Sequence, residues 1–371
     1  MKTKVLLSIL IFATTALAVK ILFFSSSTST DYIFETILDD LDDAWSLEFI
    51  NEDTILFTEM PGKLKIASLS SKSVINIDNV PSVQYLGQGG LSEVVLDPNF
   101  HSNQKIYFSY SSFDKNGQST LFLSSAEIRN NALINNKVIF EAHAPRNFPA
   151  HFGAKIAFLS DETILLTSGD GFEYREQAQT LDNHFGKIIR INKDGSVPSD
   201  NPFVNKKNAL PEIYSFGHRN MQGLVVTATG IYSHEHGPKG GDEINLIEPS
   251  LNYGWPSITY GIDYSGEIIS PFTKKEGMEQ PLLYWTPSIA PSDMIFYEGD
   301  IYPQLKNSFL VTALASKDVK KINFEDGLGI QESLFSELEI RLRNIQASPD
   351  GIIYLLTDGP KGKLIKVLPK K

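Results

Sequence analysis

The sequence contains no cysteine among its 371 residues. This absence rules out disulfide bonds, thiolate metal sites and a cysteine nucleophile, so any catalysis must use other side chains. Lysine and arginine form no basic cluster, and the formal net charge is −11. Because nucleic-acid binding needs clustered positive charge, this balance argues against DNA or RNA as a partner. Long amphipathic helical patterns are also scarce, which favours a fold built from strands.

The first thirty residues are typical of a targeting segment. A basic start, MKTK, precedes the apolar run VLLSILIFATTALAV, and Ala16-Leu17-Ala18 forms a small-x-small cleavage site. Apolar residues resume with ILFF after Lys20, so an uncleaved membrane anchor is the alternative to a cleaved signal peptide. SSSTSTD then forms a short tether. In both cases the sequence predicts export, into a periplasm or out of the cell, with membrane contact only through an uncleaved N-terminus.

One local pattern recurs along the chain: a turn rich in Asp, Asn or Gly precedes a short β-prone run. The copies are NEDTILFTE (51–59), SNQKIYFSY (102–110), SDETILLTSGD (160–170), ATGIYSHEHG (228–237), KNSFLVTAL (306–314) and PDGIIYLLTD (349–358). Six copies over roughly 310 residues give about 50 residues per unit, the size of a propeller blade. Residues 31–371 therefore predict an all-β, six-bladed β-propeller, with a pair of β-sandwiches as the alternative. Long loops in 171–215 and 238–290 are expected to form a site at one end of the central channel.

His151 is the histidine whose setting suggests chemistry. It lies in PAHFGAKIAF, before a strand-like run, and Asp170 follows nineteen residues later at the end of TSGD. A histidine at the mouth of one strand and an aspartate closing the next can meet, which gives a general base oriented by a carboxylate. A hydrogen-bonded structural histidine is the alternative. His101, His143 and His184 lie in polar turns and loops and are expected to be surface residues.

Two arginine-containing segments are suited to binding an anion. FGHRNMQGL places Arg219 and Asn220 between glycines, where a guanidinium and an amide can hold a carboxylate or an oxyanion. RLRNIQASPDG places Arg341 and Arg343 on one face of a strand, because side chains repeat every two residues. Paired guanidinium groups favour a polyanion such as a cofactor with several carboxylates. Arginines that brace a loop or lie on a solvated edge strand are the alternatives.

EHGPKGGDEINL is the most unusual segment. Its glycines expose backbone carbonyls beside Asp242 and Glu243, an oxygen-rich environment that suits Ca²⁺. It lacks the spacing of an EF-hand, and a glycine-rich hairpin with solvated acids is the alternative. Asp242 and Glu243 are adjacent on an extended chain, so their side chains are expected to point to opposite sides and to have different roles.

Together these segments resemble the soluble PQQ-dependent aldose sugar dehydrogenases of the glucose/sorbosone dehydrogenase family. The resemblance runs in order from about residue 35 to the C-terminus, without a large gap, and the family's architecture is a six-bladed propeller. The matching runs are GQGGLSEVVLDPNF, HFGAKIAF…LLTSGD, LDNHFGKIIRINKDGSVPSDNPF, EIYSFGHRNMQGL, EHGPKGGDEINLIEPSLNYGWPSITYG, MEQPLLYWTPSIAPSDMIFYEGD and RLRNIQASPDGIIYLLTD.

The resemblance implies oxidation of an aldose at C1 to a lactone, with electrons passed to an external quinone, cytochrome or dye. His151 would take the proton of the anomeric hydroxyl while hydride passes to C5 of PQQ, and Asp170 would orient His151. Arg219 and Asn220 would hold the quinone oxygens, with Arg219 stabilising the developing charge. Gln88, in GQGG, would line the substrate side of the pocket.

The resemblance also implies a Ca²⁺ ion and further cofactor contacts. The carbonyls of Gly237 and Pro238 would bind Ca²⁺ together with PQQ, and the metal would polarise the C5 carbonyl. Glu243 and Tyr253 match positions associated with calcium. The remaining cofactor contacts would come from Tyr264, from the Ala313-Leu314-Ala315 segment, and from Arg341, Leu342 and Arg343.

The sequence departs from the family pattern at three points. The family usually has Ala-Leu-Lys where this chain has Ala313-Leu314-Ala315, so a lysine that meets a PQQ carboxylate is missing; Lys317 would lie on the same face if the strand continues. HFGAK replaces the more usual HFGGR, which adds a methyl group at Ala154. Glu93 stands where Asp or Gly is usual.

Two other functions stay open from the sequence. The missing lysine would fit a non-catalytic extracellular binding propeller that has lost firm PQQ binding. A Ca²⁺-dependent propeller hydrolase acting on lactones or esters is the second alternative. Such a hydrolase needs carboxylate and amide side chains that converge on the metal in the central channel.

Overall fold

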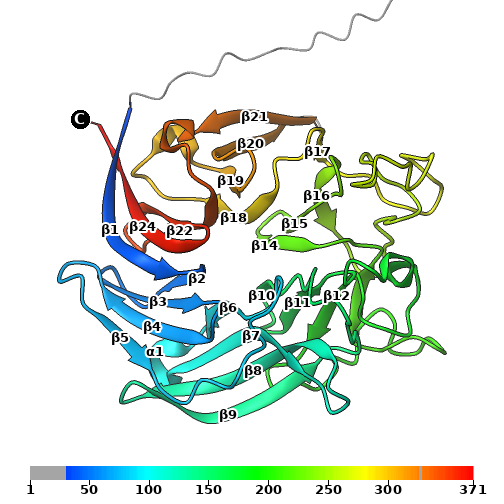
Figure 1. The fold of residues 1–371 in the computed structure, drawn as a ribbon, viewed down its shortest axis with the longest axis horizontal. Helices are drawn as coiled ribbons and strands as arrows, with labels where there is room; N and C mark the ends of the chain where they lie inside the picture. Colours follow the sequence, from blue (N-terminus) through cyan, green and yellow to red (C-terminus); the bar gives the residue numbers. More distant parts are fainter. Residues whose placement is uncertain (1–30, 326–327, 371) are drawn as a thin grey trace, which may run out of the picture.

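The computed structural model describes residues 31–325 and 328–370, and the predicted targeting segment, 1–30, lies outside them. The described residues form six four-stranded antiparallel sheets arranged in a ring around a central channel (Figure 1). The prediction of an all-β, six-bladed β-propeller is confirmed, and the alternative of two β-sandwiches is wrong. Within the described ranges, no helix is long and apolar enough to cross a membrane.

Each blade is numbered in chain order and begins with its inner strand. Blade 1 consists of β2 (Ala44–Phe49), β3 (Thr54–Glu59), β4 (Lys63–Ser68) and β5 (Val74–Ile77). Blade 2 consists of β6 (Leu91–Leu96), β7 (Lys105–Phe113), β8 (Ser119–Arg129) and β9 (Ala132–Glu141). Blade 3 consists of β10 (Ile156–Phe158), β11 (Ile164–Ser168), β12 (Lys187–Ile191) and β13 (Ile213–Phe216).

The second half of the ring has the same construction. Blade 4 consists of β14 (Met221–Thr227), β15 (Gly230–Glu235), β16 (Asp242–Ile247) and β17 (Leu283–Trp285). Blade 5 consists of β18 (Pro291–Tyr297), β19 (Ser308–Ala313), β20 (Val319–Glu325) and β21 (Leu328–Leu334). Blade 6 consists of β22 (Leu342–Ala347), β23 (Ile353–Thr357), β24 (Pro360–Pro369) and β1 (Tyr32–Asp42). The only helices among the described residues are short: α1 (Phe100–Asn103) and the 3₁₀ turns η1 (Arg175–Gln179), η2 (Pro303–Leu305) and η3 (Ser336–Leu338).

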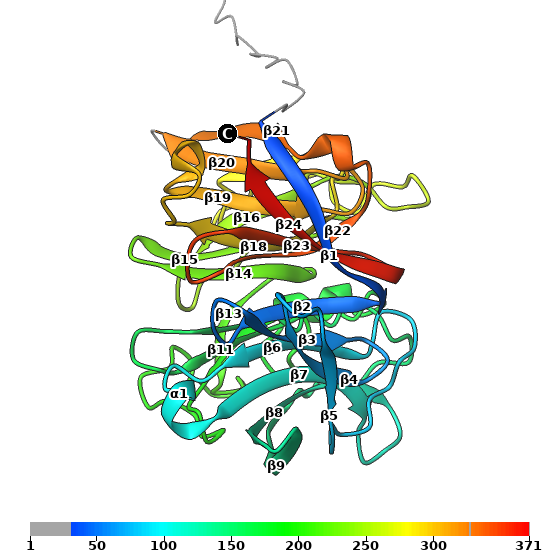
Figure 2. The same cartoon turned by 90° about the vertical axis from the view of Figure 1, so that its left-hand side faces the viewer.

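Blade 6 closes the ring with strands from both ends of the chain. β1 supplies its outermost strand and pairs antiparallel with β24, from Tyr32 opposite Pro369 to Asp42 opposite Pro360 (Figure 2). The chain passes from β1 to β2 at Asp43, so blade 6 and blade 1 are joined by a single residue. Pairing the first strand with the last covers the edge of β24 and ties the two ends of the chain together.

The six repeats of the sequence contain all or most of the second strand of each blade: β3, β7, β11, β15, β19 and β23. These strands are buried on both faces, because blades pack against neighbours on either side; β11 is buried at every position. Six apolar clusters among the described residues fill the spaces between adjacent blades. Burial on both faces explains why the repeats appear as apolar runs and not as strict alternation.

Candidate functional site

A cavity of about 290 Å³ opens where most of the inner strands begin. Its wall comes mainly from residues at or just before the first positions of β2, β6, β10, β14 and β22, so the propeller brings together residues that are distant in sequence. The lining residues are Trp45, Met60, Gly87, Gln88, His151, Arg219, Asn220, Gln222, His236, Tyr264, Leu314, Arg341 and Arg343.

The predicted pair of His151 and Asp170 forms at this cavity. His151 precedes β10, Asp170 follows β11, and the distance from His151 Nδ1 to Asp170 Oδ1 is 2.7 Å. Asp170 Oδ1 also accepts from the backbone N–H of Phe172 at 2.9 Å, and Oδ2 accepts from Trp255 Nε1 at 2.7 Å. Because these contacts fix the carboxylate, Nδ1 of the imidazole carries the proton and Nε2 is left as the acceptor. The backbone N–H of His151 donates to Gln88 Oε1 at 2.9 Å, which places Gln88 beside the same group.

The surroundings of the pair favour a neutral imidazole and a charged carboxylate. Burial and the nearby Arg219 guanidinium lower the pKa of His151, against the opposing effect of Asp170. Burial works against ionisation of Asp170, yet His151 and Arg219 outweigh it and hold the pKa of Asp170 below its usual range. At neutral pH His151 is therefore able to accept a proton.

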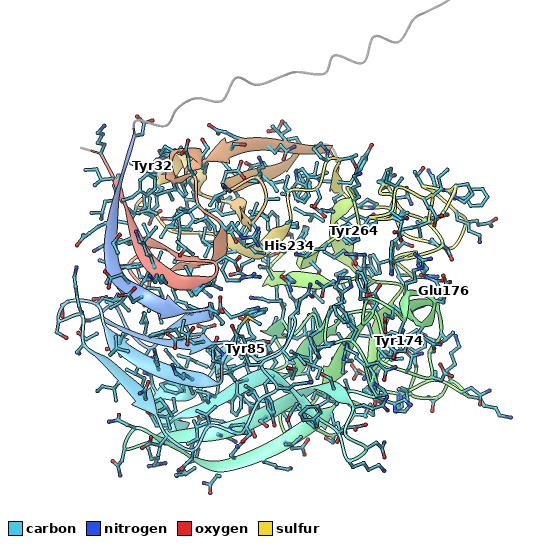
Figure 3. The ribbon with its side chains drawn as sticks, in the orientation of Figure 1. Tyr32, Tyr85, Tyr174, Glu176, His234 and Tyr264 are labelled. Atoms are coloured by element: carbon cyan, nitrogen blue, oxygen red, sulfur yellow. The ribbon has the colours of Figure 1, made fainter. Side chains whose placement is uncertain are left out.

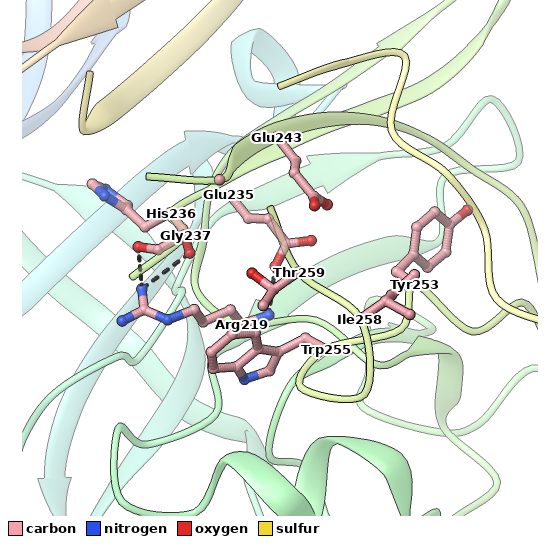
Figure 4. Close-up of a pocket in the computed structure, with 10 residues that line it drawn as sticks. Arg219, Glu235, His236, Gly237, Glu243, Tyr253, Trp255, Ile258 and Thr259 are labelled. Atoms are coloured by element: carbon pink, nitrogen blue, oxygen red, sulfur yellow. Dashed lines mark hydrogen bonds between the residues drawn. The ribbon is translucent and has the colours of Figure 1, made fainter. Parts of the chain in front are cut away.

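Arg219 lies between this pair and the glycine-rich loop of blade 4. Its NH1 group donates to the carbonyls of His236 at 3.0 Å and Gly237 at 2.8 Å (Figure 4). Its Nε is buried and has no hydrogen-bond partner among the described residues. A buried donor without a partner is costly, so this atom indicates an acceptor that enters the cavity with a ligand. Asn220 Oδ1 is held by the backbone N–H of Gly153 at 3.1 Å.

Arg341 and Arg343 reach the cavity from the start of β22, as their spacing predicted. Both bind one carboxylate: Arg341 Nε lies 2.7 Å from Asp358 Oδ2, and Arg343 Nε lies 2.9 Å from Asp358 Oδ1. With Arg219, the cavity therefore has three guanidinium groups, of which Asp358 neutralises one. The prediction that Leu342 contacts the cofactor is not supported: Leu342 packs in the core and is absent from the wall of this cavity, because alternate residues of a strand face opposite sides.

A second, larger cavity of about 670 Å³ adjoins the first and shares His236 and Tyr264 with it. Gly237, Pro238 and Ala315 are part of its wall. Figure 3 shows Tyr264 toward the middle of the ring, on the side of blade 4. Most of the predicted cofactor residues, with Gly237 and Pro238 of the predicted metal residues, are thus divided between two adjoining spaces.

The segment with the missing lysine follows β19. Ala313 ends this strand and is buried in the core, Leu314 lines the first cavity, and Ala315 lines the second. The expectation that the strand continues to Lys317 is wrong. Residues 314–318 leave the sheet, and Lys317 is exposed with a φ of 56°. The structure therefore provides no replacement at that position for the missing ammonium group.

A third, ion-sized cavity of about 10 Å³ lies beside the glycine-rich loop. The carboxylates of Glu235 and Glu243 both line it, and Figure 4 shows them between Arg219 and Tyr253. Burial and the charge of Glu235 raise the pKa of Glu243 to about 8. Two buried carboxylates side by side favour a cation between them, so these donors fit Ca²⁺.

Not every predicted metal residue offers its side chain to this cavity. The Tyr253 hydroxyl is engaged by the carbonyl of Leu246 at 2.7 Å and by the N–H of Glu248 at 2.8 Å. The carbonyl of Gly237 accepts one hydrogen bond, from Arg219, and keeps a second lone pair for a metal ion. Within the described residues, no group of three or more His, Asp or Glu side chains could hold a metal, so backbone oxygens must complete the donor set.

Asp242 and Glu243 point to opposite sides, as expected for adjacent strand residues. Asp242 Oδ1 accepts from the N–H of Gly237 at 2.9 Å. Its Oδ2 accepts from Ser288 Oγ at 2.7 Å and from the N–H of Ile289 at 2.8 Å. Asp242 therefore fixes the glycine-rich loop, while Glu243 faces the small cavity.

Two of the departures from the family pattern contact each other. Lys155, the last residue of HFGAK, lies 2.6 Å from Glu93 Oε2 and 2.8 Å from Asp293 Oδ1. Glu93 lies in inner strand β6, Asp293 lies in inner strand β18, and Lys155 comes directly before inner strand β10, so all three side chains meet in the central channel. The Trp45 ring centre lies 5.3 Å from Lys155 Nζ. Carboxylates do converge in the channel, but a lysine ammonium lies within ion-pair distance of both Glu93 and Asp293. This arrangement argues against the hydrolase alternative.

Sequence reasoning missed several residues of the site. Trp45, Gln222 and His236 line the first cavity, and Trp255 holds Asp170. Gln222 and His236 lie within two residues of predicted site residues, so extending those motifs would have found them. Trp45 had no local signal, because only the position of β2 brings it to the cavity. His101 and His143 are exposed as expected; His184 is buried, 3.0 Å from Glu212, and that expectation is wrong.

Comparisons with known proteins cover nearly the whole propeller. Residues 41–366 match the model of a family described as Glucose / Sorbosone dehydrogenase. The chain is 34% identical to aldose sugar dehydrogenase YliI of Escherichia coli strain K12 over 345 residues, covering 91% of this chain and 92% of that protein. It is 27% identical to quinoprotein glucose dehydrogenase B of Acinetobacter calcoaceticus, covering 90% and 87%. A crystal structure of a glucose dehydrogenase matches with a TM-score of 0.88 and 36% identity, covering 91% of this chain and all of that one.

Proposed function

Because this chain belongs to the glucose/sorbosone dehydrogenase family, we propose that it oxidises aldose sugars at C1 to lactones with PQQ and Ca²⁺ as cofactors. Membership makes it an oxidoreductase of the sugar dehydrogenase type. The cofactors, the oxidised carbon and the transfer of electrons to an external quinone, cytochrome or dye are the proposal. The observation that carries it is the buried His151–Asp170 pair at a cavity lined by three arginines.

His151 provides the base in this proposal. Its Nε2 lone pair accepts the proton of the anomeric hydroxyl while Asp170 keeps the imidazole in the required tautomer and stabilises the imidazolium that forms. Gln88 holds the backbone of His151 and faces the same cavity, where it can bind a sugar hydroxyl. Burial lowers the pKa of His151. The imidazole therefore stays neutral at pH values where an ordinary histidine is already protonated, and activity is lost only at a lower pH.

Arg219, Arg341 and Arg343 provide the anion-binding part of the site. The unpaired Nε of Arg219 would bind a quinone oxygen, and Arg341 and Arg343 would bind carboxylates of PQQ. The ion-sized cavity at Glu235 and Glu243 would hold Ca²⁺ with backbone oxygens of the glycine-rich loop. The bound cofactors would supply hydride acceptance by the quinone and its polarisation by the metal.

Reconstitution tests this proposal. Purified apo-protein is titrated with PQQ in the presence of Ca²⁺ while tryptophan fluorescence is followed, and dye reduction is then measured with a panel of aldoses. We expect saturable PQQ binding and sugar-dependent dye reduction that a chelator removes and Ca²⁺ restores. Absence of PQQ binding at tens of micromolar would contradict the proposal and favour the non-catalytic binding propeller.

Replacing Ala315 with lysine is expected to tighten PQQ binding. The new ammonium would enter the second cavity beside Gly237 and Pro238 and add a charge-assisted contact to a carboxylate. Such a contact contributes about 1.5–3 kcal/mol, roughly a 10- to 100-fold decrease in Kd. The same titration measures it. Lys317→Ala, in the exposed turn nearby, is the control and should leave the Kd unchanged; an Ala315→Lys protein with the wild-type Kd would show that no carboxylate lies there.

We also propose that the protein is exported, either cleaved after the apolar run or anchored by it. The support is the sequence of residues 1–30 alone. N-terminal sequencing of protein recovered from the expressing cells distinguishes the two forms. A protein that starts at Met1 and remains in the soluble cytosolic fraction would contradict the proposal.

A further inference from the structure

Arg146 is one of the largest fully buried side chains of the propeller, with 1% of its surface exposed. It forms no ion pair with a carboxylate among the described residues, because the contacts of its guanidinium group are aromatic rings and backbone carbonyls. The guanidinium carbon lies 4.5 Å from the ring centre of Phe152 and 5.4 Å from that of Phe185. Burial lowers the pKa of Arg146 to about 9, so the group is still charged at neutral pH. Asp170 opposes this effect through space but forms no ion pair with Arg146. A buried charge that no carboxylate contacts is expensive and needs an explanation.

The backbone carbonyls that Arg146 contacts belong to the two segments that carry the base and its partner. Its NH2 group donates to the carbonyl of Gly169, the residue before Asp170, at 3.2 Å, and to the carbonyl of His151 at 3.4 Å. NH1 donates to the carbonyl of Ala144 at 2.9 Å. One guanidinium group therefore joins the backbone before β10 to the backbone after β11.

The backbone is crowded and strained where the segment of His151 meets the segment of Gly169. His151 has a φ of 50°, in the left-handed region that non-glycine residues rarely adopt. A Cβ atom on Gly169 would lie 2.2 Å from the carbonyl oxygen of His151, so the two segments approach as closely as a glycine allows. Carbonyl dipoles brought together in this way repel unless a donor lies between them. Strained backbone of this kind persists only where surrounding contacts hold it.

We propose that Arg146 is a positioning residue: by binding the carbonyls of His151 and Gly169 it holds the imidazole and the Asp170 carboxylate in register for proton abstraction. The assignment rests on the function proposed above, because it presumes that His151 is the base. The role differs from that of Asp170, since Arg146 touches neither the imidazole nor the cavity. It acts only through the backbone and through its charge.

The charge of Arg146 adds a second, separable effect. The charged groups that act on His151 are Arg219, Asp170 and Arg146, and His151 in turn lowers the pKa of the nearby His236. Burial and Arg219 lower the pKa of His151 most, Asp170 opposes them, and Arg146 lowers it further. Removing the positive charge of Arg146 should therefore raise the pKa of His151, whereas keeping the charge and changing only the hydrogen bonds should not.

Two variants separate these effects. Arg146→Gln removes the charge and most of the hydrogen bonds to backbone carbonyls. Arg146→Lys keeps the charge but replaces the planar guanidinium group, which donates to several carbonyls at once, with a single ammonium group. In the reconstituted enzyme we expect kcat to fall about 10- to 100-fold in both, because a small misplacement of the base has effects of this size, while KM for the sugar and Kd for PQQ stay within about twofold. The acid midpoint of the pH–rate profile should move upward for Arg146→Gln and stay near the wild-type value for Arg146→Lys.

A matched control measures the cost of losing any buried arginine. Arg190 lies in β12 of the same blade, with 7% of its surface exposed, and binds Asp161 and Asp200 far from the pair. Arg190→Gln should destabilise the protein without changing the pH midpoint. Equal kcat losses in Arg146→Gln and Arg190→Gln, with the same midpoint in both, would overturn the proposal.

A readout on the apo-protein distinguishes failure of this inference from failure of the proposed function. The His151 imidazole is titrated by NMR in the wild type, Arg146→Gln and Arg146→Lys, and assigned with His151→Gln. An upward shift of the His151 pKa in Arg146→Gln alone supports the electrostatic coupling even if the protein oxidises no sugar. An unchanged His151 titration in Arg146→Gln overturns the coupling even if the enzyme is active.

Discussion

Replacing His151 with glutamine is expected to lower kcat for aldose oxidation by about 10²- to 10⁴-fold, the range that general-base catalysis contributes. Glutamine is close in size to histidine, and its amide can still donate to Asp170, so the cavity keeps its shape. Its amide oxygen is not a base, however, and cannot take the proton of the anomeric hydroxyl. Steady-state dye reduction with the PQQ- and Ca²⁺-loaded variant measures the loss.

Two controls make this result specific. Kd for PQQ should stay within about twofold in His151→Gln, since the anion-binding groups are Arg219, Arg341 and Arg343. His101→Gln, at an exposed position in α1, should keep the full rate. A His151→Gln protein that binds PQQ normally and turns over at the wild-type rate would remove His151 as the base. The pH–rate profile gives an independent check. Since the pKa of His151 is lowered, the wild-type acid limb should lie below the ordinary range of histidine.

Lys155→Met is expected to have the largest effect on stability, lowering the free energy of unfolding by about 3–5 kcal/mol. Lys155, Glu93 and Asp293 have 5%, 4% and 3% of their surfaces exposed, so the substitution leaves two buried carboxylates without their shared cation. The group also links blades 2, 3 and 5 across the channel, and Glu93 Oε1 receives Ser46 Oγ from blade 1 at 3.2 Å. Equilibrium unfolding in urea, followed by fluorescence, measures the change.

The matched control is Lys63→Met, which breaks the ion pair with Asp42 at a position where both side chains are about half exposed. Exposed pairs contribute little, so this variant should unfold close to the wild type. The deficit of Lys155→Met should shrink at pH 5. Burial raises the pKa of Glu93 to about 7, so this carboxyl group is partly charged at neutral pH but protonated at pH 5, where it no longer needs a cation. A deficit that is independent of pH would show that Lys155 stabilises the channel by packing alone.

The sequence predicted the architecture because the same physical requirement repeats six times. The second strand of each blade must be apolar on both faces and must follow a turn, and this pattern is local enough to recognise in NEDTILFTE or PDGIIYLLTD. Local geometry also sufficed where the relevant residues lie in one strand. Arg341 and Arg343 face the cavity while Leu342 faces the core, and Asp242 and Glu243 point to opposite sides, as the two-residue repeat of a strand requires.

Contacts between blades were decided by the tertiary structure. In the sequence, Glu93 and Lys155 belong to two separate motifs that differ from the family pattern, and nothing connects them. In the structure the two contact one another in the channel, and Lys155 also contacts Asp293, which follows it by 138 residues. Lys317 could be expected to replace a missing lysine only while β19 was assumed to continue. Trp45 reaches the cavity because β2 begins there, and Arg146 reaches the backbone of the catalytic pair because two segments cross at Gly169.

For the pair of His151 and Asp170, part of the site was determined by the sequence and part only by the tertiary structure. The sequence determined that His151 and Asp170 lie at successive strand ends, because strand period and turn chemistry are local properties. Only the folded ring decided that their side chains meet at 2.7 Å, that burial and Arg219 lower the pKa of the imidazole, and that Nε2 is left as the acceptor. A pKa depends on burial and on charges from several blades, and these are set by how distant segments pack together.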